Sequence, residues 1–143
     1  MRILGIDVGR RRVGLAISDP SGTLARPLHT VALARGVDVV DKVLAEVTRL
    51  AAEDDGLSAI VVGMPLRLDG QPTSETPYAV AFVAALQARV PVPVLTEDER
   101  LTSREAESRL AVGEKDWRRR KEKLDAAAAA VILQDYLDRR TSA

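Results

Sequence analysis

The sequence predicts an α/β fold with a mixed sheet of five strands flanked by helices. Two observations predict it. Three short β-rich runs joined by turn signals come first, and helix-periodic segments then alternate with further β-rich runs. The order β-β-β-α-β-α-β-α-α is typical of a three-stranded meander followed by parallel strands. A length of 143 residues suits one domain, so residues 1–143 are expected to form a single domain.

The meander is expected first. Residues 2–8 and 13–18 are rich in β-branched residues, and the link at 9–12 is a glycine followed by three arginines, as in a hairpin connection. Asp19-Pro20-Ser21-Gly22 is a turn signal, and residues 23–31 then run back as a third strand.

Helices and buried strands are expected to alternate in the rest of the chain. Apolar residues recur at three and four positions from residue 37 to about residue 54, which predicts an amphipathic helix. The unbroken apolar run 59–63 is typical of a strand buried on both faces. The remaining expected elements are a helix over about 74–89, a strand over 92–96, a helix capped by Thr102 or Ser103 and stopped by Gly113, and a helix over about 124–139.

Composition excludes several kinds of chemistry. The chain has no cysteine and a single histidine, His29, so thiolate zinc sites, cysteine nucleophiles and multi-histidine metal sites are ruled out. The glycine-rich nucleotide fingerprints are missing. No signal peptide and no membrane-spanning run is found, so a cytoplasmic location is expected.

Charge is balanced overall but unevenly distributed. There are 21 basic and 21 acidic residues, yet Arg10, Arg11 and Arg12 form one basic cluster. A second cluster within 115–123 is expected to be a mobile basic flap, with Trp117 either stacking on a base or pinning the flap. A neutral total does not exclude a polyanionic ligand, because local fields matter more than the sum. Either cluster could equally be a solvated face.

Four carboxylates stand where strands or helices begin or end. Asp7 ends the first run, Asp98 and Glu99 follow the 92–96 strand, and Asp125 starts the last helix. Strand ends of an α/β sheet gather at one edge, so these carboxylates could converge there. Converging carboxylates would suit a site of oxygen ligands for Mg²⁺ or Mn²⁺, two of which can assist phosphodiester hydrolysis.

Each carboxylate also has an ordinary structural interpretation. Asp7 before Gly9 could be turn chemistry, the Asp98–Glu99 pair could terminate a strand, and Asp125 could favour a helix start. Their joint placement favours the site over these separate explanations. His29 is expected to be structural.

Four ordered motifs resemble the YqgF/RuvX family of RuvC-like Holliday-junction resolvases, also described as nucleases for the small-subunit ribosomal RNA precursor. The first motif, D-x-G-x-x-R-x-G-x-A-x-S-D, is matched from Asp7 to Asp19. The second, V-G-x-P-x-x-x-D-G, is matched from Val62 to Gly70. The third, D-E-R-L-T-T, is matched from Asp98 to Ser103, where Ser103 departs from the last threonine. The fourth is the closing K-x-x-x-D-x-x-A-A-x-x-I-L stretch, matched from Lys121 to Leu133. The resemblance covers essentially the whole chain.

The resemblance implies a ribonuclease H-like fold and a metal-dependent nuclease. It implies catalytic residues Asp7, Glu99 and Asp125, metal ligation by these three with Asp98 as a further candidate, and two Mg²⁺ or Mn²⁺ ions. Glu99 is favoured over Asp98 because its longer side chain reaches back from beyond the strand. The expected nucleic-acid contacts are Arg10, Arg11, Arg12, Arg100, Lys115, Trp117, Arg118, Arg119, Arg120, Lys121 and Lys123.

Three hypotheses compete. The first is a Mg²⁺- or Mn²⁺-dependent nuclease acting on RNA or on branched or single-stranded DNA, as a monomer or a homodimer. The second is a nucleic-acid-binding processing factor with little cleavage of its own. The third, an actin-like ATPase, shares the D-x-G after a first strand but needs a second domain, for which 143 residues leave no room.

Overall fold

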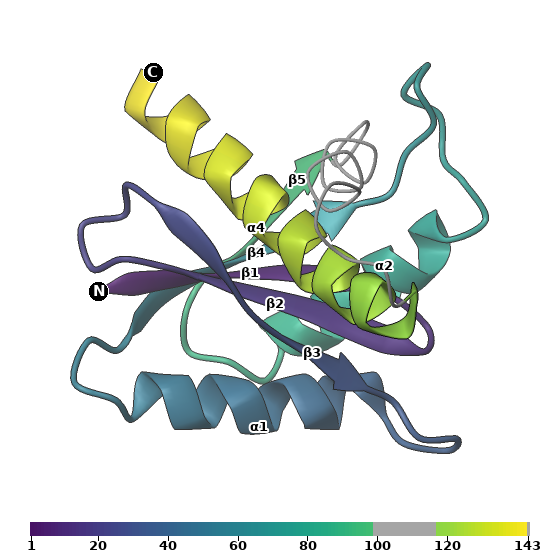
Figure 1. Ribbon diagram of the computed structural model, residues 1–143, viewed down its shortest axis with the longest axis horizontal. Coiled ribbons are helices and arrows are strands. Elements are labelled where there is room, and N and C mark those ends of the chain that lie inside the picture. The colour runs from purple at the N-terminus through teal and green to yellow at the C-terminus, as the bar shows by residue number, and fades with distance from the viewer. Residues whose placement is uncertain (99–116, 143) are drawn as a thin grey trace.

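A single five-stranded sheet organises the chain in the computed structural model (Figure 1), which describes the backbone of residues 1–98 and 117–142 and the side chains of 1–98 and 125–140. The spatial order is β3-β2-β1-β4-β5, with β1–β2 and β2–β3 antiparallel and β1–β4 and β4–β5 parallel. The strands are β1 (Arg2–Val8), β2 (Arg12–Ser18), β3 (Ala25–Ala32), β4 (Leu57–Met64) and β5 (Val94–Asp98), and the helices are α1 (Val39–Ala51), α2 (Thr76–Gln87) and α4 (Trp117–Ser142). The predicted meander and mixed sheet are confirmed.

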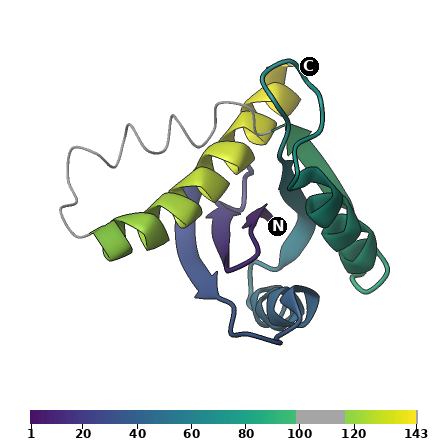
Figure 2. The ribbon, with the colours of Figure 1, turned by 90° about the vertical axis from the view of Figure 1, so that its right-hand side faces the viewer.

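The sheet lies between two helical layers. Helix α4 covers one face, while α1 and α2 cover the other (Figure 2). The strands alternate accordingly, since successive side chains point to opposite faces. Ile3 and Val61 pack with Leu133 under α4, whereas Leu4 and Ile60 belong to the larger core under α1 and α2.

Helix α1 illustrates how local signals start an element. The Asp38 carboxylate caps it by accepting a hydrogen bond from the Val40 amide at 2.7 Å. Val40, Val43, Val47 and Leu50 then follow at helical spacing and are all buried against the sheet. The cap and the apolar stripe together fix where the helix begins and which face it buries.

Helix α4 lies unusually close to the sheet. The Cβ that Gly5 lacks would stand 2.7 Å from the Leu133 Cβ and 3.0 Å from the Ala129 carbonyl oxygen. Ala126 and Ala129, the helix residues that face Gly14 and Gly5, are both buried. Small residues on both sides therefore allow the helix backbone to approach β1 and β2.

The turn between β2 and β3 is built around Asp19. Its carboxylate accepts hydrogen bonds from the amides of Thr23 and Leu24, each at 2.8 Å, and from the Ser21 hydroxyl. The Ser21 hydroxyl and these amides lower the pKa of Asp19 from 3.8 to about 2. The ionised carboxylate thus organises the turn that the sequence predicted at 19–22.

Two expectations about element boundaries are wrong. The last helix begins at Trp117 rather than near Leu124, so residues 117–123 are helical and do not form a loop. Arginine, lysine and glutamate are good helix formers, and a high charge density does not by itself break a helix. Strand β5 runs over 94–98 rather than 92–96, which places Asp98 at its last position. The expected helix after Thr102 or Ser103 lies outside the described residues.

No helix in the described ranges 1–98 and 117–142 is long and apolar enough to cross a membrane.

Candidate active site

Asp7 stands at the end of β1 on the face that α4 covers. It is half-buried, and strand alternation groups it with Ile3 and Gly5, both of which contact α4. In the β1–β2 ladder Asp7 is level with Gly14. The predicted position of Asp7 at a strand end is therefore confirmed.

Asp125 approaches the same place from α4. A Cβ on Gly14 would overlap the carbonyl oxygen of Asp125, so the helix backbone rests directly on the strand position beside Asp7. The Asp125 side chain is 25% exposed, and its Oδ2 lies 2.6 Å from the Arg12 Nε. The structure thus brings together Asp7, Arg12 and Asp125, which the sequence predicted as site residues.

Asp98 lies elsewhere. It ends β5 level with Met64, a residue that packs against the core under α1 and α2. Its neighbour Glu97 is level with Gly63 and faces α4. Alternation therefore directs Asp98 away from the face that Asp7 and Asp125 share. Glu99 lies outside the described residues.

Glu97 is a buried acid that the sequence analysis did not single out. Its side chain is only 3% exposed, and its Oε1 lies 2.5 Å from Nη2 of Arg139 on α4. Among the described residues this oxygen has no well-directed hydrogen bond. Burial raises the pKa of Glu97 above 4.5, and Arg139 opposes this shift only in part. Period-2 alternation along β5 was the signal that could have placed Glu97 on the α4 face.

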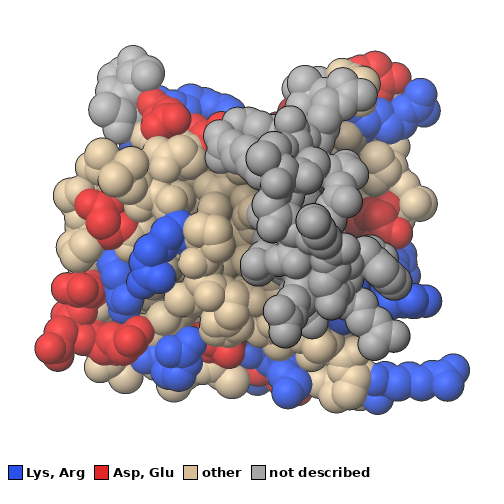
Figure 3. Space-filling view, in the orientation of Figure 1, with Lys and Arg blue, Asp and Glu red and all other residues tan. Residues whose placement is uncertain are grey.

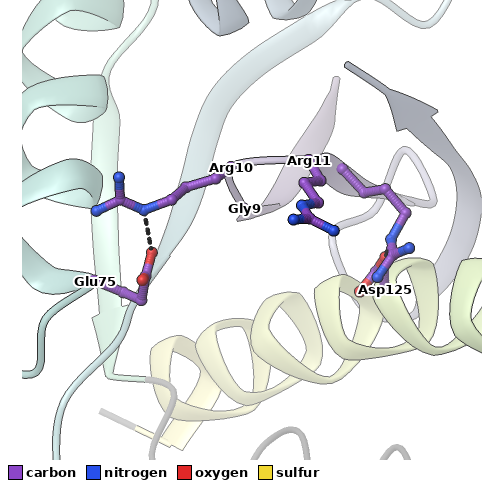
Figure 4. Close-up of a pocket in the computed structure, with 6 residues that line it drawn as sticks. Gly9, Arg10, Arg11, Glu75 and Asp125 are labelled. Carbon is purple, nitrogen blue, oxygen red and sulfur yellow. Dashed lines mark hydrogen bonds and ion pairs between the residues drawn. The ribbon is translucent and has the colours of Figure 1, made fainter. Parts of the chain in front are cut away.

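The arginines after Gly9 point in different directions: Figure 4 shows Arg10 turned toward Glu75 and Arg11 turned away from it, while Arg12 pairs with Asp125. Arg10 forms an ion pair with Glu75 at 3.0 Å and lies over the Tyr78 ring, 5.1 Å from its centroid. Arg11 lies between Arg10 and Asp125 in the close-up. These side chains surround a pocket of about 280 Å³. The pocket is lined by Gly9, Arg10, Arg11, Arg12, Glu75 and Asp125.

Glu75 was also missed by the sequence analysis. It is the residue before α2, and it meets Arg10 from 65 positions along the chain. No local pattern marks such a contact. The remaining predicted basic contacts are not placed by the structure: Arg100 and Lys115 lie outside the described residues, as do the side chains of Trp117, Arg118, Arg119, Arg120, Lys121 and Lys123.

The donor chemistry fits a hard divalent cation. Asp7 and Asp125 offer carboxylate oxygens, the ligands that Mg²⁺ and Mn²⁺ prefer. The absence of a side chain at Gly14 lets the α4 backbone at Asp125 lie directly on β2, level with Asp7. Two carboxylates are too few for a complete ligand set, and within the described ranges no group of three histidine, cysteine or acidic residues gathers to hold a metal.

Comparison with known proteins places this arrangement in context. The model of the RuvX family, described as "Holliday junction resolvase", matches residues 1–139. A protein of Anaeromyxobacter sp. (strain K) named "Putative pre-16S rRNA nuclease" is 44% identical over 141 residues, covering 98% of each chain. A protein of Chloroflexus aggregans with the same name is 43% identical over 139 residues, covering 96% of this chain and 94% of the other.

Solved structures share the fold at much lower identity. Thermus thermophilus RuvC aligns with a TM-score of 0.56 at 19% identity, covering 99% of this chain and 97% of the other. The Fowlpox virus resolvase bound to Holliday junction DNA aligns with a TM-score of 0.59 at 11% identity, covering 98% and 99%. These similarities confirm the ribonuclease H-like fold expected from the resemblance. The family match and the curated relatives confirm the expected nuclease class. The chain belongs to the RuvX family.

Proposed function

We propose that the chain is a divalent-cation-dependent nuclease whose metal ligands are Asp7, Asp125 and Glu99. The observation that carries the proposal is the convergence of Asp7 and Asp125 at Gly14, on one face of the sheet. Glu99 is included because the D-E-R-L-T-T motif of the family places its middle acidic position on the Asp98–Glu99 pair, and strand alternation directs Asp98 to the other face. Bound Mg²⁺ or Mn²⁺, as two ions, would activate water and stabilise the departing oxygen of a phosphodiester.

The protein's own residues supply position and charge. Arg12 holds the Asp125 carboxylate from the β2 side, and its remaining guanidinium N–H groups can reach a phosphate oxygen. Arg11 lines the same pocket and provides a second cation for the nucleic-acid backbone. The helical basic segment at the start of α4, residues 117–123, extends the positive charge along the chain toward Asp125.

Precursor ribosomal RNA is the substrate we favour. Relatives that are 43–44% identical over nearly their whole length carry that substrate in their names. The resolvases that act on branched DNA share only the fold at this level of identity. A single strand or a branched duplex remains the alternative to be compared in the same assay.

The test is a metal titration of cleavage. Purified protein is offered precursor RNA, branched DNA and single strands, each with increasing Mg²⁺ or Mn²⁺. Cleavage should require the metal and should fall by roughly 10²-fold or more in Asp7→Asn, because the metal ions supply most of the charge stabilisation. Asp54→Asn removes an exposed acid distant from the site and should behave as wild type. Metal-independent binding without product would instead identify a processing factor.

A further inference from the structure

A second basic pocket adjoins the candidate active site. It has a volume of about 540 Å³, is lined by Arg10, Arg11, Arg35, Leu33, Val37 and Tyr78 among others, and shares Arg10 and Arg11 with the pocket that contains Asp125. The two pockets therefore lie next to each other at the arginine hairpin. Figure 3 shows basic side chains gathered at the lower right corner, where Figure 1 places this hairpin and the β3–α1 connection.

The backbone presents Arg35 by a defined turn. The Val37 amide donates to the Ala34 carbonyl at 3.1 Å, and Gly36 between them has a φ of 81°. This pattern is typical of a type II turn, in which the third residue must adopt a positive φ and the second projects outward. The turn is tied to the hairpin by the Leu33 amide, which donates to the Arg11 carbonyl at 2.8 Å. Arg11 and Arg35 are thus held beside one another by backbone contacts.

The guanidinium groups of this region divide into two kinds. Arg10 and Arg12 are ion-paired with Glu75 and Asp125. Arg11 and Arg35 are exposed, and neither forms an ion pair with any residue whose side chain the structure describes. Two neighbouring cations without carboxylate partners are suited to bind phosphate oxygens.

The pocket also has an apolar wall. Val37 is 38% exposed, Leu33 is half-buried, and the Tyr78 ring is fixed by its hydroxyl donating to the Gly9 carbonyl at 3.3 Å and by Arg10 over one face. Cations alone would suit any anion, but cations beside aromatic and aliphatic surface suit a nucleotide whose base is unpaired. In a duplex the bases are stacked and cannot reach such a wall.

We infer that this pocket binds one unpaired nucleotide of the strand whose cleavage is proposed above, with its phosphate on Arg11 and Arg35 and its base against Val37, Leu33 and Tyr78. The inference rests on the proposed function for the direction in which the strand continues, toward Asp125. According to this inference, Arg35 and Val37 are binding residues that favour a single strand over a duplex next to the cleaved bond.

The experiment measures binding without divalent metal, so that it does not depend on cleavage. The probe is a fluorescent single strand of roughly 12 nucleotides, matched to the site sizes of single-strand binders, and an otherwise identical strand with abasic positions. Arg35→Ala should weaken binding several-fold and flatten the plot of log affinity against log salt by about 0.7, the value for one lost phosphate contact on a single strand. Arg26→Ala is the matched control. Arg26 is exposed on β3, has no ion-pair partner among the described side chains and lines neither pocket.

Val37→Ser tests the apolar wall separately. It should weaken binding of the intact strand several-fold and leave binding of the abasic strand unchanged. The inference is overturned if Arg35→Ala and Arg26→Ala show the same affinity and salt slope. It is equally overturned if Val37→Ser does not separate intact from abasic strands, or if polyglutamate competes as well as the oligonucleotide. Failure of the proposed function would appear differently, as wild-type protein that binds with these properties but yields no product with Mg²⁺ or Mn²⁺.

Discussion

The Nε of Arg12 lies 2.6 Å from Oδ2 of Asp125, which joins the second strand to the last helix at the candidate active site. Both side chains are partly buried, at 32% and 25% exposure, so solvent screens this pair less than a surface ion pair. The Oδ2 atom of Asp125 is therefore held in place by the protein itself. If Asp125 binds a metal ion as proposed, Arg12 would both orient that ligand and oppose the charge of the metal.

Arg12→Gln should separate these two effects. Removing the positive charge should lower the metal concentration that gives half-maximal cleavage, because a nearby cation no longer competes. The maximal rate should nevertheless fall several-fold, since Asp125 loses its orienting partner. Both quantities come from one metal titration, and Arg10→Gln, which breaks the neighbouring pair with Glu75, is the control. An unchanged metal dependence would contradict the proposed position of Arg12 beside the metal.

Glu99→Gln and Asp98→Asn should differ strongly in cleavage. Asp98 is level with Met64 on the face under α1 and α2, so its neutralisation should cost little activity. Glu99→Gln should lower the rate by roughly 10²-fold or more if it completes the metal ligands. Metal-dependent cleavage and metal binding by calorimetry check the ranking. The reverse order would move the third ligand to Asp98.

Gly14→Ala should damage both stability and cleavage. The added methyl group would overlap the carbonyl of Asp125 and push α4 away from β2. Overpacking of this kind costs about 1–3 kcal/mol of unfolding free energy. Gly5→Ala is the comparison, because its methyl group would clash with the same helix at Leu133, further from Asp125. Urea unfolding measures the loss of stability in each variant. If the two losses are equal, Gly14→Ala should still lose more cleavage activity than Gly5→Ala. Equal activity in the two variants would show that the position of α4 at Gly14 does not matter for the site.

Asp19→Asn should destabilise the protein in a pH-dependent way. The pKa of Asp19 is lowered to about 2 in the folded protein, so the folded state releases this proton at a lower pH than the unfolded state does. The stability that the ionised Asp19 carboxylate contributes is fully present above pH 3.8 and is lost as the pH falls toward 2. Wild type and variant should therefore differ at neutral pH and converge near pH 2. The unfolding midpoint measured across this range checks the convergence, and a constant difference would contradict it.

Glu97→Gln should have the opposite dependence. Burial raises the pKa of Glu97. Just above pH 4.5, the unfolded chain has therefore released a proton that the folded protein retains. Wild-type stability from this group falls as the pH rises from 4.5 through the raised pKa, and the variant should not show that fall. Arg139→Ala removes the opposing cation and should extend the fall to higher pH. Parallel stability curves for wild type and Glu97→Gln would refute the assignment.

The sequence was sufficient to predict the strands, because β-branched runs and turn residues are local signals. It was also sufficient for the placement of Asp7 at a strand end, whereas Asp125, expected at the start of the last helix, lies more than two turns inside α4. The face on which Asp98 lies depends on where β5 ends, and a shift of the strand by two residues cannot be inferred from composition. The helical state of residues 117–123 was missed because their charge was weighed more heavily than their helix propensity. The Arg10–Glu75 pair joins positions 65 residues apart and has no local signature.

The contact between α4 and Gly14 has a consequence for when activity can begin. Arg12 and Asp125 are separated by 113 positions, so the proposed cleavage centre cannot form until the last helix has packed on the sheet. Long-range contacts of this kind form late, because the intervening chain must first be ordered. The proposed site is therefore completed only when the last helix packs on the sheet.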